Sequence, residues 1–284
     1  MSWSFKKFDV LPEDKFLLWE KLLESRTGIQ LAPQQKVLLQ TQIAIRMREL
    51  SIASYDEYYE QVKKDDKSGL VEWQVLVDRL VVKETTFFRH RPSLEYVRQY
   101  LKNKLSLEEV GDSFDIWSVG CSTGEEPYGL AIVASDCLKE TNQHFYFGVT
   151  AIDVSLPALS IARRGVYGPR SMSFLTEGEH DNYFRPYDDG HSEVLPRLKK
   201  RVCFSQVNIN NLSVMPVQKM DVVFCQNVLI YFRRWRRREI LNQLVERLKP
   251  GGLLIIGLGE TTDWQHPEMQ RVDNDEVQAY IRIK

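Results

Sequence analysis

The chain has 284 residues, which is enough for one large domain or two of modest size. Its 43% hydrophobic and 27% charged residues are typical of a globular protein, and a net charge of −1 excludes a general attraction to nucleic acid or membrane surfaces. No apolar run approaches the ~20 residues of a transmembrane helix, and the N-terminus lacks a signal-peptide pattern, so we expect a cytoplasmic protein without membrane insertion.

The cysteines form no C-x-x-C pair along the sequence. They are Cys121, Cys137, Cys203 and Cys225. Most of them lie in apolar or strand-like surroundings, which are typical of buried free thiols in a reducing compartment. This spacing excludes a disulfide framework and a structural zinc site, and we expect no metal.

Residues 1–77 are predicted to form a small all-helical domain, because no strand pattern occurs there. Apolar residues recur at helical spacing in several segments, with start and stop signals between them. These signals are Pro12, Gly28, Pro33, Ser54 and Ser68. The second helix carries Lys36, Arg46 and Arg48, which form either a solvated face or a surface for an acidic partner.

Residues 78–92 are predicted to link this domain to the next one and to contribute to a site. Phe87 and Phe88 directly precede Arg89 in this segment. One interpretation is a helix end that packs on the core. The other places Arg89 beside a ligand, because binding sites favour the junction of two domains.

Residues 114–132, FDIWSVGCSTGEEPYGLAI, are predicted to form a buried strand, a glycine turn and a helix. Gly120 and Gly124 would let the backbone approach a bulky ligand. Their spacing matches neither the dinucleotide fingerprint nor the phosphate loop, so a turn without a ligand stays an alternative. Glu125 and Glu126 would repel a pyrophosphate but tolerate a sulfonium, which favours S-adenosylmethionine over NAD or ATP.

Residues 93–284 are predicted to form an α/β domain with a mostly parallel, doubly wound sheet and helices on both faces. The expected strands are 114–119, 145–152, 201–207, 220–225, 253–256 and 276–284. The expected helices are 93–105, 127–138 and 233–248. Irregular residues at about 168–200 leave room for a small β-subdomain.

Polar residues follow several of these strands. Asp153 follows the second strand, where an acidic residue usually accepts hydrogen bonds from ribose hydroxyls, although capping of the next helix is an equal alternative. Asn208 follows another strand, and Gln226 and Asn227 follow the buried strand MDVVFC. The carboxyl edge of the sheet is therefore the expected ligand site.

The densest run of charge comes directly after NVLIYF. It consists of Arg233, Arg234, Arg236, Arg237 and Arg238. Most such runs are solvated helix faces. Its position at the predicted mouth of the site makes contact with an acidic macromolecule an alternative.

Several phrases occur in a fixed order along the chain. They are TTFFR at 85–89, STGEEPYGLAI at 122–132, ARRGVY at 162–167, FCQNVLIYF at 224–232 and LKPGG at 248–252. This ordered set resembles the CheR family, the methyltransferases that modify bacterial chemoreceptors. The phrases TGIQLAPQQK, RMREL and SYDEYYEQV are similar to that family's helical domain.

The resemblance implies a class I S-adenosylmethionine-dependent methyltransferase fold. It implies methyl transfer to glutamate side chains in the cytoplasmic helical region of methyl-accepting chemoreceptors, or of proteins in a pili or surface chemosensory array. The products would be glutamyl methyl esters and S-adenosylhomocysteine. The resemblance further implies a monomer that binds no nucleic acid.

The family's functional residues can be carried over position by position. Its cofactor contacts fall on Thr85, Arg89, Glu125, Asp153, Asn208, Ile209, Asn227 and Val228. Arg89 and Tyr231 fall on the positions that the family places at the reacting carboxylate. Lys83 stands where the family usually has Asn, and G-L-G-E at 257–260 stands where it often has G-H-S-E. The segment 185–202 is shorter than the corresponding segment of family members that dock a receptor's C-terminal peptide.

The residue types present suit this reaction. A glutamate carboxylate has a pKa near ~4.3 and is already a nucleophile at neutral pH, so no general base is needed. We find no Ser-His-Asp or Cys-His constellation in the sequence. The planar fork of Arg89 can bind a carboxylate, and Tyr231 can donate one hydrogen bond to it.

Two other functions remain open from the sequence. A nucleic-acid methyltransferase is favoured by the arginine run and by RLKKR at 197–201, but the strand-end phrase QNVLIY lacks an Asn-Pro-Pro-Tyr arrangement and the net charge is not basic. A non-catalytic scaffold that binds S-adenosylmethionine as a sensor is favoured by Lys83 and by the short segment before residue 202.

Overall fold

The computed structural model describes residues 10–31, 35–81, 84–111, 113–141, 145–214 and 216–283. The chain divides into two compact units, Met1–Val82 and Lys83–Lys284. A helical domain ending at residue 77 and a linker at 78–92 are expected from the sequence. In the structure the helix continues to Leu80, which is 6% exposed, because its apolar face is still covered there.

The described residues of the smaller unit are helical. The helices are α1 (Glu13–Thr27), α2 (Lys36–Glu49), α3 (Tyr55–Lys63) and α4 (Lys67–Leu80). Gly28 ends α1 in a left-handed conformation with φ of 76°, and Ser54 caps α3, as predicted. The fourth helix begins before Ser68, because the Asp66 carboxylate accepts a backbone N–H of its first turn. Pro33, the predicted start of the second helix, lies outside the described residues.

An ion pair lies in the interior of this helical unit. Glu72 on α4 is 4% exposed, and Arg46 on α2 donates to both of its carboxylate oxygens at 2.7 Å. The Tyr58 hydroxyl on α3 donates to the same carboxylate at 2.7 Å. Arg46 is therefore used inside the unit and is not part of a solvated basic face.

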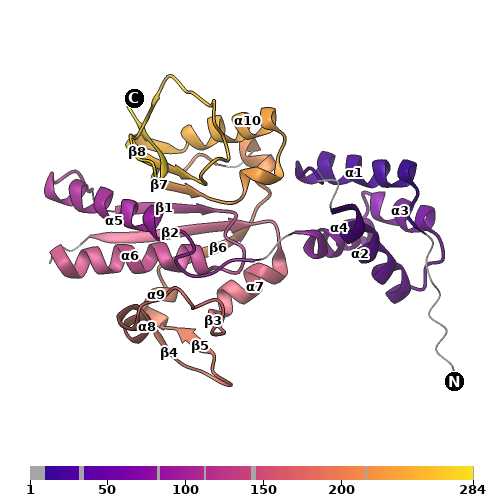
Figure 1. Ribbon diagram of the computed structural model, residues 1–284, viewed down its shortest axis with the longest axis horizontal. Coiled ribbons are helices and arrows are strands. Elements are labelled where there is room, and N and C mark those ends of the chain that lie inside the picture. Colours follow the sequence, from indigo (N-terminus) through magenta and orange to yellow (C-terminus); the bar gives the residue numbers. More distant parts are fainter. Residues whose placement is uncertain are drawn as a thin grey trace. The chain divides into compact units, whose positions relative to one another are not determined.

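The described residues of the larger unit form a seven-stranded sheet in the order β6-β2-β1-β7-β8-β10-β9 (Figure 1). The strands are β1 (Ser113–Val119), β2 (Tyr146–Asp153), β6 (Val202–Gln206), β7 (Met220–Cys225), β8 (Leu248–Ile256), β9 (Met269–Arg271) and β10 (Gln278–Arg282). Strands β6, β2, β1, β7 and β8 are parallel, and β10 runs antiparallel between β8 and β9. The predicted mostly parallel sheet is therefore confirmed.

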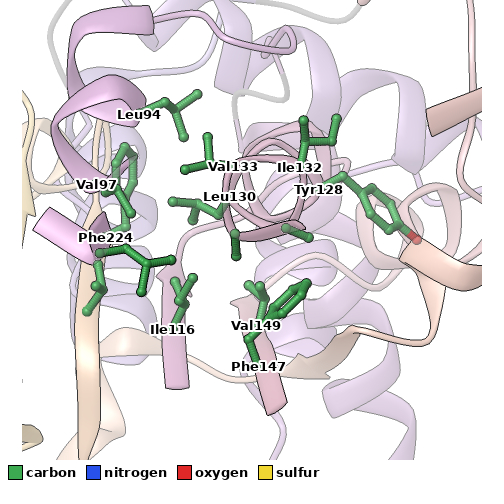
Figure 2. Close-up of a cluster of buried hydrophobic side chains, with 14 of the residues drawn as sticks. Leu94, Val97, Ile116, Tyr128, Leu130, Ile132, Val133, Phe147, Val149 and Phe224 are labelled. Atoms are coloured by element: carbon green, nitrogen blue, oxygen red, sulfur yellow. The ribbon is translucent and has the colours of Figure 1, made fainter. Parts of the chain in front are cut away.

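Helices cover both faces of this sheet. The helices are α5 (Arg91–Ser106), α6 (Glu125–Thr141), α7 (Leu156–Arg164) and α10 (Arg234–Val245). Figure 2 shows Leu94 and Val97 of α5 and Leu130 of α6 above the buried strand residues Ile116 and Phe224. The next residue along β1, Trp117, faces the opposite side, where the guanidinium of Arg247 after α10 lies 5.9 Å from its ring. Within the described ranges, no helix combines the length and apolar character needed to span a membrane.

Strand β8 departs from the predicted boundaries. A helix is predicted to continue to Leu248, but α10 ends earlier and β8 begins at this residue. Met220 on β7 pairs with Leu248, whereas Val222 pairs with Leu253, so the KPGG segment bulges out of the sheet. Lys249 in the bulge forms ion pairs of 2.6 and 3.4 Å with aspartates on β7 and β1, which explains why the segment remains part of the sheet.

A second, small sheet lies in the region of the predicted β-subdomain (Figure 1). Its strands are β3 (Val166–Tyr167), β5 (Ser192–Val194) and β4 (Phe184–Pro186), accompanied by α8 (Glu177–Tyr183) and α9 (Pro196–Lys199). The buried ring of Phe87 packs edge-on against Tyr167 at 4.9 Å and Phe184 at 5.1 Å. The small sheet is thus attached to the segment that carries Arg89.

One cysteine differs from the expectation of buried thiols. Cys121, Cys137 and Cys225 are buried and free, but Cys203 is exposed. Cys203 lies on β6, which is the edge strand of the large sheet and is therefore covered less than the central strands.

Candidate functional site

The strand order reverses between β1 and β7, which places a topological switch point at the carboxyl ends of these strands. Gly120 follows β1 with a left-handed φ of +77°. A Cβ atom at Gly120 would lie 2.3 Å from Cγ2 of Val228, so a larger residue would displace the loop after β7. The two loops of the switch point are therefore in direct contact, and glycine is required between them.

The turn after β1 is closely packed against the segment that leads to β3. Gly124 has φ of +97°, and a Cβ atom there would lie 2.7 Å from Cβ of Ala162. The Tyr167 hydroxyl donates to the carbonyl oxygen of Thr123 at 2.7 Å. Helix α6 then begins at Glu125. The predicted strand, glycine turn and helix are therefore confirmed.

Asp153, at the end of β2, connects three strand ends. Its Oδ2 accepts the N–H of Ser122 at 2.8 Å, and its Oδ1 accepts the N–H of Ser155 at 2.9 Å. Ser155 is the residue that caps α7. Asp153 therefore binds the backbone of the capping residue but is not the cap itself. The carbonyl oxygen of Asp153 accepts the N–H of Val207 at 2.9 Å, which brings Asn208 to the same edge.

Asn208 and Ile209 begin the segment that follows β6. Oδ1 of Asn208 accepts the N–H of Asn210 at 2.9 Å, and Ile209 opens the short helix η2 (Ile209–Val214). Oδ1 of Asn210 is buried and has no hydrogen-bond partner among the residues that the structure describes. A buried acceptor in this state fits a ligand that brings N–H donors to the segment.

Glu125 and Glu126 are set into the protein at the start of α6. Glu125 is 2% exposed, and the Thr123 hydroxyl donates to its Oε2 at 2.6 Å. The Ser118 hydroxyl donates to Oε1 of Glu126 at 2.7 Å. Burial raises the pKa of Glu125 and, with a further contribution from Glu260, raises the pKa of Glu126 to about 8. The two full negative charges expected from the sequence are therefore not both present at neutral pH.

Arg89 lies at the end of a strained turn. Phe88 directly before it has φ of +52°, a conformation that is costly for an aromatic residue. The exposed Arg89 side chain donates to the carbonyl oxygen of Glu84 at 3.2 Å. Its positive charge opposes the rise in the pKa of Glu126 and of Tyr231 that burial causes, so the guanidinium acts electrostatically on both groups.

Tyr231 belongs to the turn after β7, which forms the short helix η3 (Leu229–Tyr231). Burial raises the pKa of its hydroxyl, and Glu260 raises it further. Asn227 precedes this turn with a left-handed φ of +58° and an exposed side chain. The residues of FCQNVLIYF thus surround the switch point.

Most of the predicted site residues therefore share one edge of the sheet. The turn after β1 contacts Val228 and Asp153, and Arg89 acts electrostatically on Tyr231. Thr85 is half-buried in the segment that leads to Arg89. Lys83, where the sequence departs from the family pattern, lies outside the described residues.

The structure gives a part at the site to three residues that are not among the contacts carried over from the family. They are Glu126, Glu260 and Arg237. Glu126 adjoins the predicted contact Glu125, and Glu260 closes the G-L-G-E phrase, so both had a sequence signal. Arg237 lies in a run of arginines, and nothing in the sequence distinguishes it from its neighbours.

The arginine run is largely engaged within the protein. Arg234 and Arg238 both pair with Asp263, and Arg236 pairs with Glu239 at 2.7 Å. These internal pairs weaken the argument for a nucleic-acid surface, and that alternative is not favoured.

The family model described as CheR methyltransferase, SAM binding domain, matches residues 83–278, and the one described as CheR methyltransferase, all-alpha domain, matches residues 14–81. Chemotaxis protein methyltransferase 1 of Pseudomonas aeruginosa is 32% identical over 248 residues, which cover 86% of this chain and 89% of the relative. A chemotaxis protein methyltransferase of Borreliella burgdorferi is 27% identical over 267 residues, covering 92% of this chain and 94% of the relative. The probable biofilm formation methyltransferase WspC of Pseudomonas aeruginosa is 30% identical over 256 residues, covering 89% of this chain and 58% of the relative. Because the family matches extend over both units, the chain belongs to the CheR methyltransferase family, and S-adenosylmethionine (SAM) is its cofactor.

Proposed function

We propose that the protein transfers a methyl group from SAM to glutamate side chains of bacterial chemoreceptors, or of a receptor that controls surface behaviour. The observation that carries this proposal is the exposed guanidinium of Arg89, which acts electrostatically on Tyr231 and Glu126 in a SAM-binding domain. An exposed guanidinium there favours an acidic substrate. The names of the chemotaxis relatives support the receptor, and WspC supports the surface alternative.

The proposed SAM contacts come from several strand ends and from the segment before α5. They are Thr85, Arg89, Glu125, Asp153, Asn208, Ile209, Asn227 and Val228. The carboxylate of Asp153, held by two backbone N–H groups, is suited to accept hydrogen bonds from ribose hydroxyls. The unpartnered Oδ1 of Asn210 is suited to the amino group of adenine.

SAM supplies a methyl group carried on a positively charged sulfur. When bound, SAM would give this methyl group to an oxygen of the substrate carboxylate, and its sulfur would keep the electron pair of the broken carbon–sulfur bond. No proton moves, because a glutamate side chain is already ionised at neutral pH. The protein's part is therefore to align oxygen, carbon and sulfur.

Arg89 and Tyr231 are the proposed catalytic residues. The guanidinium of Arg89 binds one edge of the substrate carboxylate through its planar fork, and the hydroxyl of Tyr231 donates one hydrogen bond. The raised pKa of Tyr231 keeps this hydroxyl protonated as a donor. The raised pKa of Glu126, about 8, keeps a second negative charge away from the incoming carboxylate at neutral pH.

The substrate glutamates in this proposal lie in the cytoplasmic helical region of the receptor, and the protein acts in the cytoplasm as a monomer. The family match and the names of the chemotaxis relatives support a chemotaxis receptor as the substrate. A carboxylate on an exposed helix face can reach an exposed arginine without unfolding.

The test is an incubation of the full chain with methyl-labelled SAM and cytoplasmic fragments of chemoreceptors. We expect label on the receptor that base releases as methanol, the signature of a carboxyl methyl ester. SAM binding without such label for any receptor fragment would mean a non-catalytic scaffold. Label on RNA or DNA, with binding that falls steeply with salt, would mean a nucleic-acid enzyme.

A further inference from the structure

The turn that carries Tyr231 is anchored by apolar side chains at its two ends, since Leu229 and Phe232 are both buried. Within Leu229–Tyr231 the side chain of Leu229 is buried, while Ile230 is 49% exposed. Asn227 before the turn is exposed and has φ of +58°. The residues between these two anchors have no buried side chain, so their position depends on the groups that bind their backbone.

Glu260, which closes the G-L-G-E phrase, holds the turn from one side. It is 2% exposed, and its Oε1 accepts the N–H of Ile230 at 3.4 Å, while Oε2 accepts the N–H of Gly257 at 2.8 Å. The backbone N–H groups of Val228 and Leu229 also donate to this carboxylate. One buried side chain thus satisfies several donors at the start of the turn.

Arg237 on α10 holds the other end of the turn. Its Nε donates to the carbonyl oxygen of Phe232 at 2.8 Å, and its Nη2 donates to that of Ile230 at 3.2 Å. Its Nη1 donates to the carbonyl oxygen of Glu260 at 2.8 Å. A single guanidinium therefore joins the loop after β7 to the loop after β8.

The loop that carries Glu260 is itself fixed to the sheet. Gln278 on β10 is 5% exposed, and its Oε1 accepts the N–H of Gly259 at 3.2 Å. Its Nε2 donates to the carbonyl oxygen of Thr261 at 2.6 Å. Glu260 is therefore presented from a rigid element, as a residue that positions a site must be.

We propose that Glu260 and Arg237 are positioning residues, which hold the backbone of residues 227–232 so that Val228 faces the cofactor and Tyr231 faces the substrate. The part of this proposal that concerns Tyr231 rests on the proposed function. The expected effect on cofactor binding can be tested without it. Val228 lies against the turn at Gly120, so a displaced loop would alter the SAM site directly.

The decisive variants are Arg237→Ala and Arg237→Lys in the full chain, with Arg236→Ala as the matched control. Arg236 is the neighbouring residue on α10, and its partner is Glu239 on the same helix. A lysine can replace the charge of Arg237 but cannot donate to three carbonyl oxygens in one plane.

We expect both Arg237 variants to bind S-adenosylhomocysteine about tenfold more weakly by calorimetry, a loss of about 1.4 kcal/mol, because the loop that presents Val228 is no longer joined to the loop after β8. Backbone hydrogen exchange at residues 227–232 should become faster, while the thermal midpoint stays near that of Arg236→Ala. With receptor present, we expect kcat to fall more than KM rises, because Tyr231 is displaced in the bound complex.

The proposal is overturned if Arg237→Lys binds S-adenosylhomocysteine and exchanges residues 227–232 like the control. If Arg237→Ala does not fold, Glu260→Gln decides, with the same expected loss of affinity and protection and the same contrary result. The affinity and hydrogen-exchange measurements need no receptor. A wild-type protein that binds S-adenosylhomocysteine but methylates nothing would therefore refute the proposed function, while the positioning role would still be decided by these measurements.

Discussion

The two units differ in the direction in which the pKa of a buried carboxyl group is shifted. In the helical unit, burial raises the pKa of Glu72, but hydrogen bonds from Arg46 and Tyr58 outweigh this and the pKa is lowered overall. In the sheet unit, Glu126 and Glu260 accept hydrogen bonds from a serine hydroxyl and from backbone N–H groups. Burial there prevails, and the pKa of both groups is raised.

This difference indicates where the protein reserves its chemistry. A carboxylate whose charge is fully compensated contributes to the fold of its unit. Carboxylates that remain under-compensated cluster at functional sites, where a nearby cation is kept available for a ligand. Arg89 is such a cation, because it is exposed and its charge only partly opposes the rise in the pKa of Glu126.

The largest effect is expected for Arg89→Ala. If Arg89 is kept for the substrate carboxylate, its loss should lower kcat/KM for receptor methylation by about 10²- to 10³-fold, as for the loss of other groups that bind a reacting oxygen. The thermal midpoint should hardly change, because the side chain is exposed. The measurement is initial-rate methyl transfer from labelled SAM.

Arg163→Ala is the matched control for this variant. Arg163 is also exposed and also donates to a backbone carbonyl oxygen, that of Phe204 at 2.9 Å. Its rate should stay near that of the wild type. If Arg89→Ala turned over receptor within a few-fold of this control, Arg89 would not be the residue that binds the substrate carboxylate.

The next largest effect is expected for Glu72→Ala in the helical unit. Removing one partner of a buried pair leaves Arg46 without its bidentate acceptor, which should lower the free energy of unfolding by about 3 kcal/mol. Urea denaturation measures this loss, and faster hydrogen exchange across α2 and α4 should locate it.

Glu49→Ala tests whether burial is the cause. Glu49 binds the same arginine at 2.9 Å, but its side chain is 41% exposed. Its removal should have a much smaller effect. Equal losses for the two variants would show that the interior position of Glu72 does not matter.

Much of this fold follows from local patterns in the sequence. The apolar run MDVVFC forms β7 with the predicted bounds, because a strand in the middle of a parallel sheet is apolar on both faces. The predicted closing strand EVQAYIRIK contains β10. The boundaries differ from the prediction where a contact distant in sequence decides them. The KPGG segment belongs to β8 because Lys249 is held by aspartates on β1 and β7, a contact that local turn signals do not register.

The candidate site was predictable where each residue follows a strand, as Asp153 and Asn208 do. The residues that hold the site together could not be predicted, because their partners are remote in the sequence. Glu260 reaches the N–H of Ile230 across 30 positions, and Arg237 reaches the carbonyl oxygen of Glu260 across 23. No periodicity or motif encodes such a pairing.

A pH-dependent effect is expected for Glu126→Gln. The unfolded chain releases this proton near pH 4.5, whereas the folded protein keeps it up to about pH 8. The folded state therefore binds more protons between these values, so this group's contribution to stability is full below pH 4.5 and is lost as the pH rises to about 8.

Glu126→Gln should remove that loss, which for one group is at most about 1.4 kcal/mol per pH unit. Urea denaturation without cofactor at several pH values measures the difference between variant and wild type. The two stability profiles should diverge as the pH rises, with the variant the more stable at alkaline pH. Parallel profiles would contradict the raised pKa and with it the contrast to Glu72.

The smallest effect is expected for Tyr231→Phe, which removes one hydroxyl and leaves the ring. One hydrogen bond to a charged substrate group contributes about 1.5 kcal/mol, so kcat should fall about tenfold. The affinity for SAM should hardly change, because the hydroxyl is proposed to face the carboxylate. Tyr187→Phe, at an exposed position beyond β4, should leave both quantities unaltered. Calorimetry that finds SAM binding lost in Tyr231→Phe would instead make this tyrosine a cofactor contact, and Arg89 would be left as the one proposed contact to the substrate carboxylate.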